Sequence, residues 1–230
     1  HTVADMGLLK MDFLGLRTLT VIHDTETAVR HTKDPDFRVA NIDYDDPATY
    51  EMLTRGETMG IFQLESTGMT QVLVGMRPKN LEDIIALISL YRPGPMDSIP
   101  TYLRNRKDPS HVTYKTPQMA HIVDVTNGVV IYQEQVMQIC RELAGFSFGQ
   151  ADNVRRAMSK KKLKVMEAER EHFVHGCTEP GKECAGCVKN GIPEAVANQI
   201  YDDMISFASY AFNKSHAACY AYVAYQTGYL

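Results

Sequence analysis

The segment 8–14 has the alternating pattern of a strand. Its central residues run apolar, charged, apolar, charged, apolar in the order Leu9, Lys10, Met11, Asp12, Phe13. A two-residue period places successive side chains on opposite faces of a strand. We therefore predict a half-buried strand that carries two charged side chains on its open face.

After this strand, apolar residues recur at the three- and four-residue spacing of amphipathic helices. Helices are predicted over residues 19–30, 47–56, 81–88, 134–144, 149–160, 191–211 and 215–229. The last is apolar and aromatic nearly all round, so we expect it to be largely buried. Segment 33–46 reads as a linker, and 61–64 as a short extended piece. The fold class expected from this pattern is mainly α.

Composition adds that the chain can build a packed core. It has 230 residues, of which 44% are apolar and 23% charged. It contains neither an apolar run long enough for a membrane span nor a secretory signal, so a cytoplasmic location is expected. Five cysteines, three of them within eleven residues, are unlike the disulfide framework of a secreted protein. The first residue is His1 rather than Met, which suggests a fragment.

A net charge of −4 conceals one strongly basic segment. Between residues 155 and 164 there is no acid, and the six bases are Arg155, Arg156, Lys160, Lys161, Lys162 and Lys164. Adjacent arginines on a helix can donate paired hydrogen bonds to phosphate oxygens, which indicates a triphosphate or a nucleic-acid backbone as partner. The alternative is a solvated helix face with an Asp152–Arg156 pair.

Two sets of polar residues on other predicted elements are further candidates for metal or phosphate binding. Asp12 could ligate Mg²⁺ beside Lys10, which could contact phosphate, although a strand-edge ion pair explains the same residues. Another group stands at the start of the last helix, where anions often bind, and comprises Asn213, Lys214, Ser215 and His216. The alternative for His216 is a capped or hydrogen-bonded core residue.

The cysteine-rich loop is a candidate zinc site. Its ligands would be His175, Cys177, Cys184 and Cys187, with His172 nearby. The spacing matches no standard zinc finger, and reduced loop cysteines are the alternative. No P-loop, Rossmann or serine-hydrolase motif occurs in the sequence.

Six ordered motifs together resemble the bacterial DNA polymerase III alpha subunit family, the C-family of replicative polymerases. They are the segments 9–18, 61–66, 91–95, 132–137, 155–161 and 212–217. The resemblance implies an internal piece of a longer protein. Residues 1–20 would end an α+β, nucleotidyltransferase-like palm and supply its catalytic strand. Residues 21–46 would connect it to helical fingers over 47–230.

The resemblance also implies roles for the candidate residues. Asp12 matches one of three palm acids that bind two Mg²⁺ ions, and Lys10 matches a catalytic lysine near the triphosphate. Arg155 and Arg156, with Lys160, match the fingers cations that hold the triphosphate. Residues 213–216 match the segment against the sugar and base, with His216 placed to exclude a 2′-hydroxyl. Arg92 and Glu134 would support the fingers, and no family property implies zinc.

The expected function is therefore that of a DNA-directed DNA polymerase. Its partners would be primer–template DNA, deoxynucleoside triphosphates, the rest of the polymerase chain and, in the full protein, the sliding clamp and replisome subunits. The fragment alone would be inactive, because two palm acids lie outside it. Two alternatives remain, a non-catalytic helical nucleic-acid-binding module and a zinc-stabilised interaction domain.

Overall fold

The computed structural model describes residues 5–9, 11, 13–160, 162–208 and 212–230. They are mainly helical, as predicted. The helices are α2 (Arg17–Thr32), α3 (Pro47–Thr54), α4 (Thr67–Met76), α5 (Leu81–Leu90), α6 (Ile99–Lys107), α7 (Ala120–Val123), α8 (Gln133–Ala144), α9 (Phe148–Ser159), α10 (Leu163–His175), α11 (Glu194–Ala208) and α12 (Lys214–Tyr229). Short 3₁₀ turns are η1 (Val39–Asn41), η2 (Pro95–Ser98), η3 (Pro109–His111), η4 (Pro117–Met119) and η5 (Asp124–Thr126).

Polar side chains fix where four of these helices begin. Each accepts a hydrogen bond from the backbone N–H three residues later, which satisfies a donor that the helix itself cannot. These caps are Asp46 of α3, Ser66 of α4, Asn80 of α5 and Asn213 of α12. Pro47 follows the first cap, where its missing N–H costs nothing.

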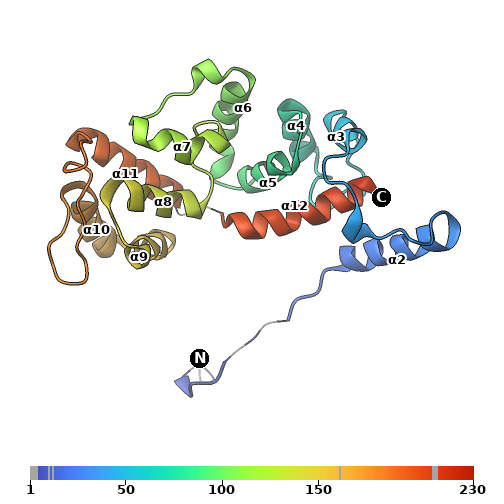
Figure 1. The fold of residues 1–230 in the computed structure, drawn as a ribbon, viewed down its shortest axis with the longest axis horizontal. Coiled ribbons are helices and arrows are strands. Elements are labelled where there is room, and N and C mark those ends of the chain that lie inside the picture. Colours follow the sequence, from blue (N-terminus) through green and yellow to red (C-terminus); the bar gives the residue numbers. More distant parts are fainter. Residues whose placement is uncertain (1–4, 10, 12, 161, 209–211) are drawn as a thin grey trace.

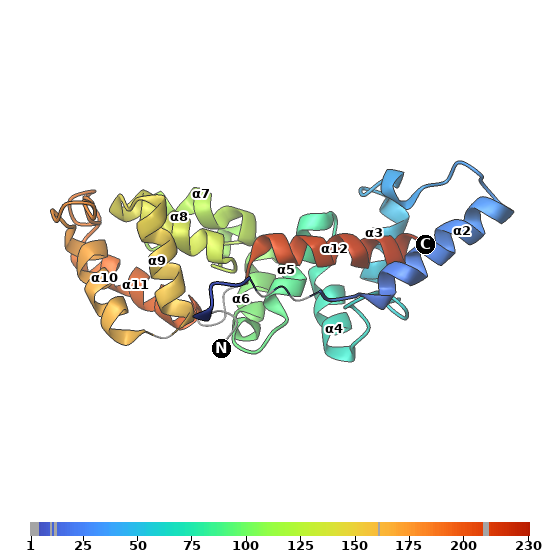
Figure 2. The ribbon, with the colours of Figure 1, turned by 90° about the horizontal axis from the view of Figure 1, so that it is seen from below.

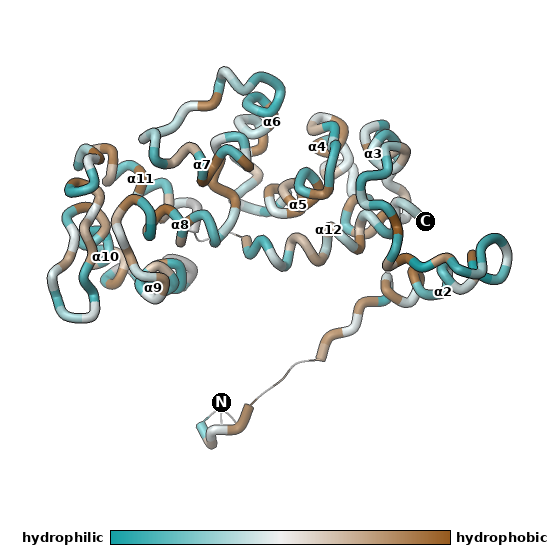
Figure 3. Tube along the Cα trace, viewed as in Figure 1, coloured by the Kyte–Doolittle hydropathy of each residue, from teal (hydrophilic) through white to brown (hydrophobic). Residues whose placement is uncertain are grey.

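The first of two hydrophobic cores forms around α5. Residues 83–90 are buried on every side of this helix, and α12 runs along it (Figure 1). The hydropathy view shows α5 as a hydrophobic segment surrounded by other helices (Figure 3). The buried face of α12 is built from Ala217, Ala221, Ala224 and Tyr225. Small alanine side chains let two helix backbones approach closely, so this face is tightly packed.

The second core joins α7, α8, α9, α10 and α11. At its centre the ring of Phe173 packs 6.3 Å from that of Phe146 and 5.3 Å from that of Tyr201, measured between centroids. Figures 1 and 2 place these helices at one end of an elongated molecule, and α2 and α3 at the other. The α12 helix lies between the two ends, and its first turn contacts Glu134 at the start of α8.

The predicted strand over 8–14 is not observed. None of its described residues belongs to a strand, and the side chains of Leu9 and Phe13 are 81% and 90% exposed. The described residues before α2 extend away from the helices (Figure 1). A strand needs a neighbour to satisfy its N–H and C=O groups. Within the described ranges, only two isolated bridges occur, between Tyr132 and Phe212 and between Cys177 and Cys184.

Three smaller expectations are corrected. Residues 61–64 form a turn rather than an extended piece, with Gln63 at a φ of 67°. The α12 helix is buried along one face only, since Cys219 and Tyr222 are exposed. His172 and His175 lie in α10 and not in a loop. In the part of the chain that the structure describes, no helix has the length and apolar character needed to cross a membrane.

Candidate functional site

The two cores meet where the start of α8 lies beside the start of α12. The backbone N–H of Gln133 donates to the carbonyl of Phe212 at 3.0 Å, and that of Phe212 donates to Ile131 at 3.4 Å. These bonds hold residues 131–134 against residues 212–214. We call this contact the junction, because it places the predicted α12 site residues next to the second core.

Glu134 secures the α12 side of the junction. Its carboxylate accepts hydrogen bonds from Asn213 Nδ2 at 3.0 Å and from the backbone N–H of Lys214 at 3.1 Å. Asn213 Oδ1 in turn accepts from the N–H of His216 at 2.9 Å. A carboxylate of the protein therefore already occupies this helix start, where the sequence suggested room for an external anion.

The side chains of residues 214–216 divide between two sides of α12. Lys214 Nζ lies 2.9 Å from the carboxylate of Glu82. Together with Ser215 and Glu134, these two residues line a groove of about 380 Å³. Two carboxylates make this groove unfavourable for a triphosphate. His216 instead lies beside aromatic rings, away from that groove.

The α9 cations share one carboxylate. Asp152 accepts hydrogen bonds from Arg155 Nε at 2.9 Å and NH2 at 2.7 Å, and pairs with Arg156 Nε at 2.7 Å. The predicted Asp152–Arg156 pair is thus present. Hydrogen bonds from Arg155 are the main cause that keeps the pKa of Asp152 below its ordinary value of 3.8.

Arg155 also ties α9 to the junction, since its NH1 donates to Gln133 Oε1 at 3.0 Å. Its side chain is 26% exposed, whereas that of Arg156 is 65% exposed. Lys160 is exposed one helical turn beyond Arg156. Arg155 therefore serves as a fixed connection, and Arg156 and Lys160 present cations to the outside.

A row of rings and one cation follows the other side of α12. The guanidinium carbon of Arg92 lies 3.6 Å from the ring centroid of Phe212. That ring stands 5.2 Å from the imidazole of His216 at an interplanar angle of 80°. His216 is 4.5 Å from the ring of Tyr220, which is 5.2 Å from that of Phe62. Motif reading drew attention to Arg92 but gave no sign of its contact with Phe212, because 120 positions separate the two residues.

Of the other predicted sites, one falls outside the described residues and the other is not assembled. Lys10 and Asp12 lie outside the described residues. Within the described part of the chain, no three His, Cys, Asp or Glu side chains are grouped to hold a metal ion, so the zinc prediction for His175, Cys177, Cys184 and Cys187 is not supported.

The cysteine loop has a structural explanation instead. Cys177 and Cys184 exchange two backbone hydrogen bonds of 3.0 and 2.9 Å, while Cys187 is completely buried in the second core. His175 turns toward Glu194, 3.7 Å away. Burial raises the pKa of Cys187 to about 12, so its thiol stays protonated.

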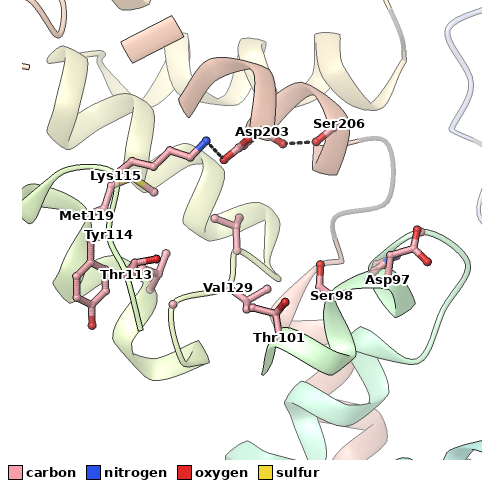
Figure 4. Close-up of a pocket in the computed structure, with 15 residues that line it drawn as sticks. Asp97, Ser98, Thr101, Thr113, Tyr114, Lys115, Met119, Val129, Asp203 and Ser206 are labelled. Atoms are coloured by element: carbon pink, nitrogen blue, oxygen red, sulfur yellow. Dashed lines mark hydrogen bonds and ion pairs between the residues drawn. The ribbon is translucent and has the colours of Figure 1, made fainter. Parts of the chain in front are cut away.

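A pocket that sequence reasoning missed lies between α6, the segment 113–119 and α11 (Figure 4). Its volume is about 730 Å³. Lys115 reaches across to Asp203 of α11, with 2.5 Å between Nζ and Oδ2. Met119 and Val129 supply an apolar wall. None of the predicted site residues line this pocket, so it is separate from the junction.

Comparisons with known proteins agree with the motif pattern. Residues 18–181 match the model of the bacterial DNA polymerase III alpha subunit finger domain. The chain is 48% identical over 99% of its length to the DNA polymerase III subunit alpha of Thermus aquaticus. It is 46% identical over 98% to the same subunit of Staphylococcus aureus strain COL. It spans only 18% and 20% of the lengths of these two relatives.

Proposed function

The chain belongs to the family of bacterial DNA polymerase III alpha subunit finger domains, and we propose that it binds the incoming deoxynucleoside triphosphate in a replicative DNA polymerase. The observation that carries this proposal is the junction. It connects Arg155 through Gln133 and Phe212 to His216. Cations suited to phosphate and a histidine suited to a sugar are therefore held in one rigid framework.

In this proposal, Arg156 and Lys160 bind the triphosphate. Both are exposed on α9, whose buried face fixes their direction. A guanidinium donates bidentate hydrogen bonds to phosphate oxygens, and Arg156 can exchange Asp152 for such a partner. Arg155 keeps Asp152 and Gln133 in place during that exchange.

The proposal places the sugar against His216. Its backbone N–H is held by Asn213, and its ring stands between Phe212 and Tyr220. A side chain held this way rejects a 2′-hydroxyl by steric conflict, because it has little freedom to move aside. Asn213 acts here by holding His216. Lys214 would contact the nucleotide only after leaving Glu82, whereas Ser215 is exposed and could contact it directly.

The metal-dependent step belongs to the complete enzyme. Nucleotidyl transfer with two Mg²⁺ ions would use Asp12 as one ligand and Lys10 near the triphosphate, as the resemblance implies. Among the described residues, no three His, Cys, Asp or Glu side chains are grouped to hold a metal ion. Primer–template DNA, the rest of the polymerase and the clamp are partners proposed on the same resemblance.

The test uses the complete polymerase chain that carries this segment. Arg156→Ala should weaken deoxynucleotide binding about tenfold in single-turnover incorporation, as expected for losing one charge-assisted contact. Binding of primer–template DNA, measured by fluorescence anisotropy, should change less than about twofold. The matched control is Arg104→Ala, which removes another exposed arginine, on α6.

The opposite pattern would contradict the proposal. If Arg156→Ala lowered DNA affinity and reduced its salt dependence, with nucleotide binding unchanged, the basic face would contact the nucleic-acid backbone. That result would favour a nucleic-acid-binding module.

A further inference from the structure

We propose that Arg92 is a positioning residue for nucleotide selection, acting on His216 through the ring of Phe212. This inference rests on the proposed function, in which His216 faces the sugar. In that proposed function, Arg92 contacts neither the sugar nor the phosphates of the nucleotide. Its basis is the geometry on the side of α12 opposite the Lys214 groove.

The backbone fixes Arg92 from both sides. Its N–H donates to Leu90 at 2.8 Å, at the end of the buried α5 helix, and its carbonyl accepts from Met96 at 3.1 Å. Between these bonds, Gly94 has a φ of 103°, which favours glycine and sets the turn. Arg92 therefore projects from a rigid corner of the first core.

The guanidinium of Arg92 is held by an aromatic ring. Across the described residues, it forms no ion pair with a carboxylate, and its close contact is the face of Phe212 at 3.6 Å. Burial lowers the pKa of Arg92. A partly desolvated cation over a ring face is attracted by the negative charge of that face. This attraction restricts the orientation of the Phe212 ring.

Phe212 passes this restriction to His216. Its backbone is anchored by Ile131 and Gln133 at the junction, so only its side chain can turn. Its ring meets the imidazole of His216 edge to face. Because Asn213 holds the backbone of His216, the ring contacts are what decide the direction of the imidazole. Without Arg92, the Phe212 ring and then the imidazole can adopt other orientations.

The test measures kcat/KM for a deoxynucleotide and for the matching ribonucleotide in the complete polymerase. Arg92→Gln and Phe212→Leu should each lower the ratio of the two values about fivefold, the factor expected for one cation–ring contact. Phe212→Tyr keeps the ring and should keep the ratio. Arg92→Lys keeps the charge but loses the planar contact. Its ratio should therefore lie between those of the unmodified enzyme and Arg92→Gln.

Two controls make the result decisive. Arg141→Gln removes another cation–ring contact, 5.7 Å from the ring of Phe148, and should leave the ratio unchanged. His216→Ala should lower the ratio at least as far as Arg92→Gln. A general loss of folding or of phosphate binding would lower kcat/KM for both nucleotides by the same factor and leave the ratio unchanged.

Two outcomes would overturn the inference. If His216→Ala lowers the ratio but Arg92→Gln, Arg92→Lys and Phe212→Leu do not, His216 selects the sugar without help from Arg92. If His216→Ala also leaves the ratio unchanged, the sugar role of His216 in the proposed function fails, and the inference fails with it.

Discussion

A buried ion pair supports the first core, and its loss should strongly destabilise the chain. Asp83, at the start of α5, has a side chain only 7% exposed, and that of its partner Arg106 is 21% exposed. Two bonds of 2.6 Å join the carboxylate to the guanidinium. The carboxylate also accepts from the backbone N–H of Lys79, and Arg106 Nε donates to the carbonyl of Met76. The pair thus links α4, α5 and α6.

The expected magnitude follows from the burial. Removing one partner of a buried pair costs about 3–5 kcal/mol, because the remaining charge stays desolvated. Water can reach part of Arg106, so Asp83→Ala should cost about 3 kcal/mol, at the lower end of that range. Arg106→Ala leaves the more deeply buried carboxylate and should cost about 4 kcal/mol. The double variant should cost no more than the larger single loss, about 2–4 kcal/mol, because no charge is left buried.

The assay is urea unfolding of the chain followed by circular dichroism at 222 nm, with the two single variants and the double variant forming a mutant cycle. The control is Glu57→Ala, which breaks an exposed pair with Arg55 and should produce no measurable change. A double-variant loss equal to the sum of the two single-variant losses would contradict this coupling between Asp83 and Arg106. Additivity would mean that the two charges stabilise the fold independently.

Asn213→Ala removes the α12 cap and should lower the unfolding free energy by about 1 kcal/mol, whereas Asn213→Ser, which keeps an uncharged cap acceptor beside the Glu134 carboxylate, should retain most of it. Iodoacetamide at pH 8 should modify the exposed Cys219 and spare Cys140 and Cys187, whose pKa values are raised by burial; peptide mass spectrometry reads the sites, and rapid labelling of Cys187 would contradict its burial. Because the folded pKa of Asp152 is lower than its unfolded value, the stability it contributes is fully present above about pH 4–5 and lost as the pH falls through the folded pKa. The Asp152→Asn variant should therefore show a shallower loss of stability on acidification, and an unchanged acid profile would contradict this.

Local patterns in the sequence were sufficient to find most of the helices. The 47–56, 134–144 and 149–160 predictions correspond to α3, α8 and α9 within a few residues. Asp46 before Pro47 marks a helix start by chemistry confined to one turn. The basic face of α9, with its Asp152–Arg156 pair, was also readable from residues four apart. Such features depend on neighbours in sequence, so no tertiary information is needed to recognise them.

Patterning alone is not sufficient where an element depends on a distant partner. The alternation of residues 8–14 is compatible with a strand, but a strand forms only beside another that takes up its hydrogen bonds. The four proposed zinc ligands are close in sequence, yet α10 and the second core direct His175 and Cys187 to different surroundings. Spacing alone does not decide such directions.

The family, the helical character and the identity of the cationic and helix-start residues could all be predicted from the amino-acid sequence alone. How those residues are combined depends on the packing of distant helices. Packing of α12 along α5 brings Phe212 beneath Arg92, and the junction brings Glu134 to Lys214, 80 positions away. These contacts arise because burying the apolar faces of α5 and α12 fixes the two helices relative to each other. The polar groups at their ends must then satisfy one another across the chain.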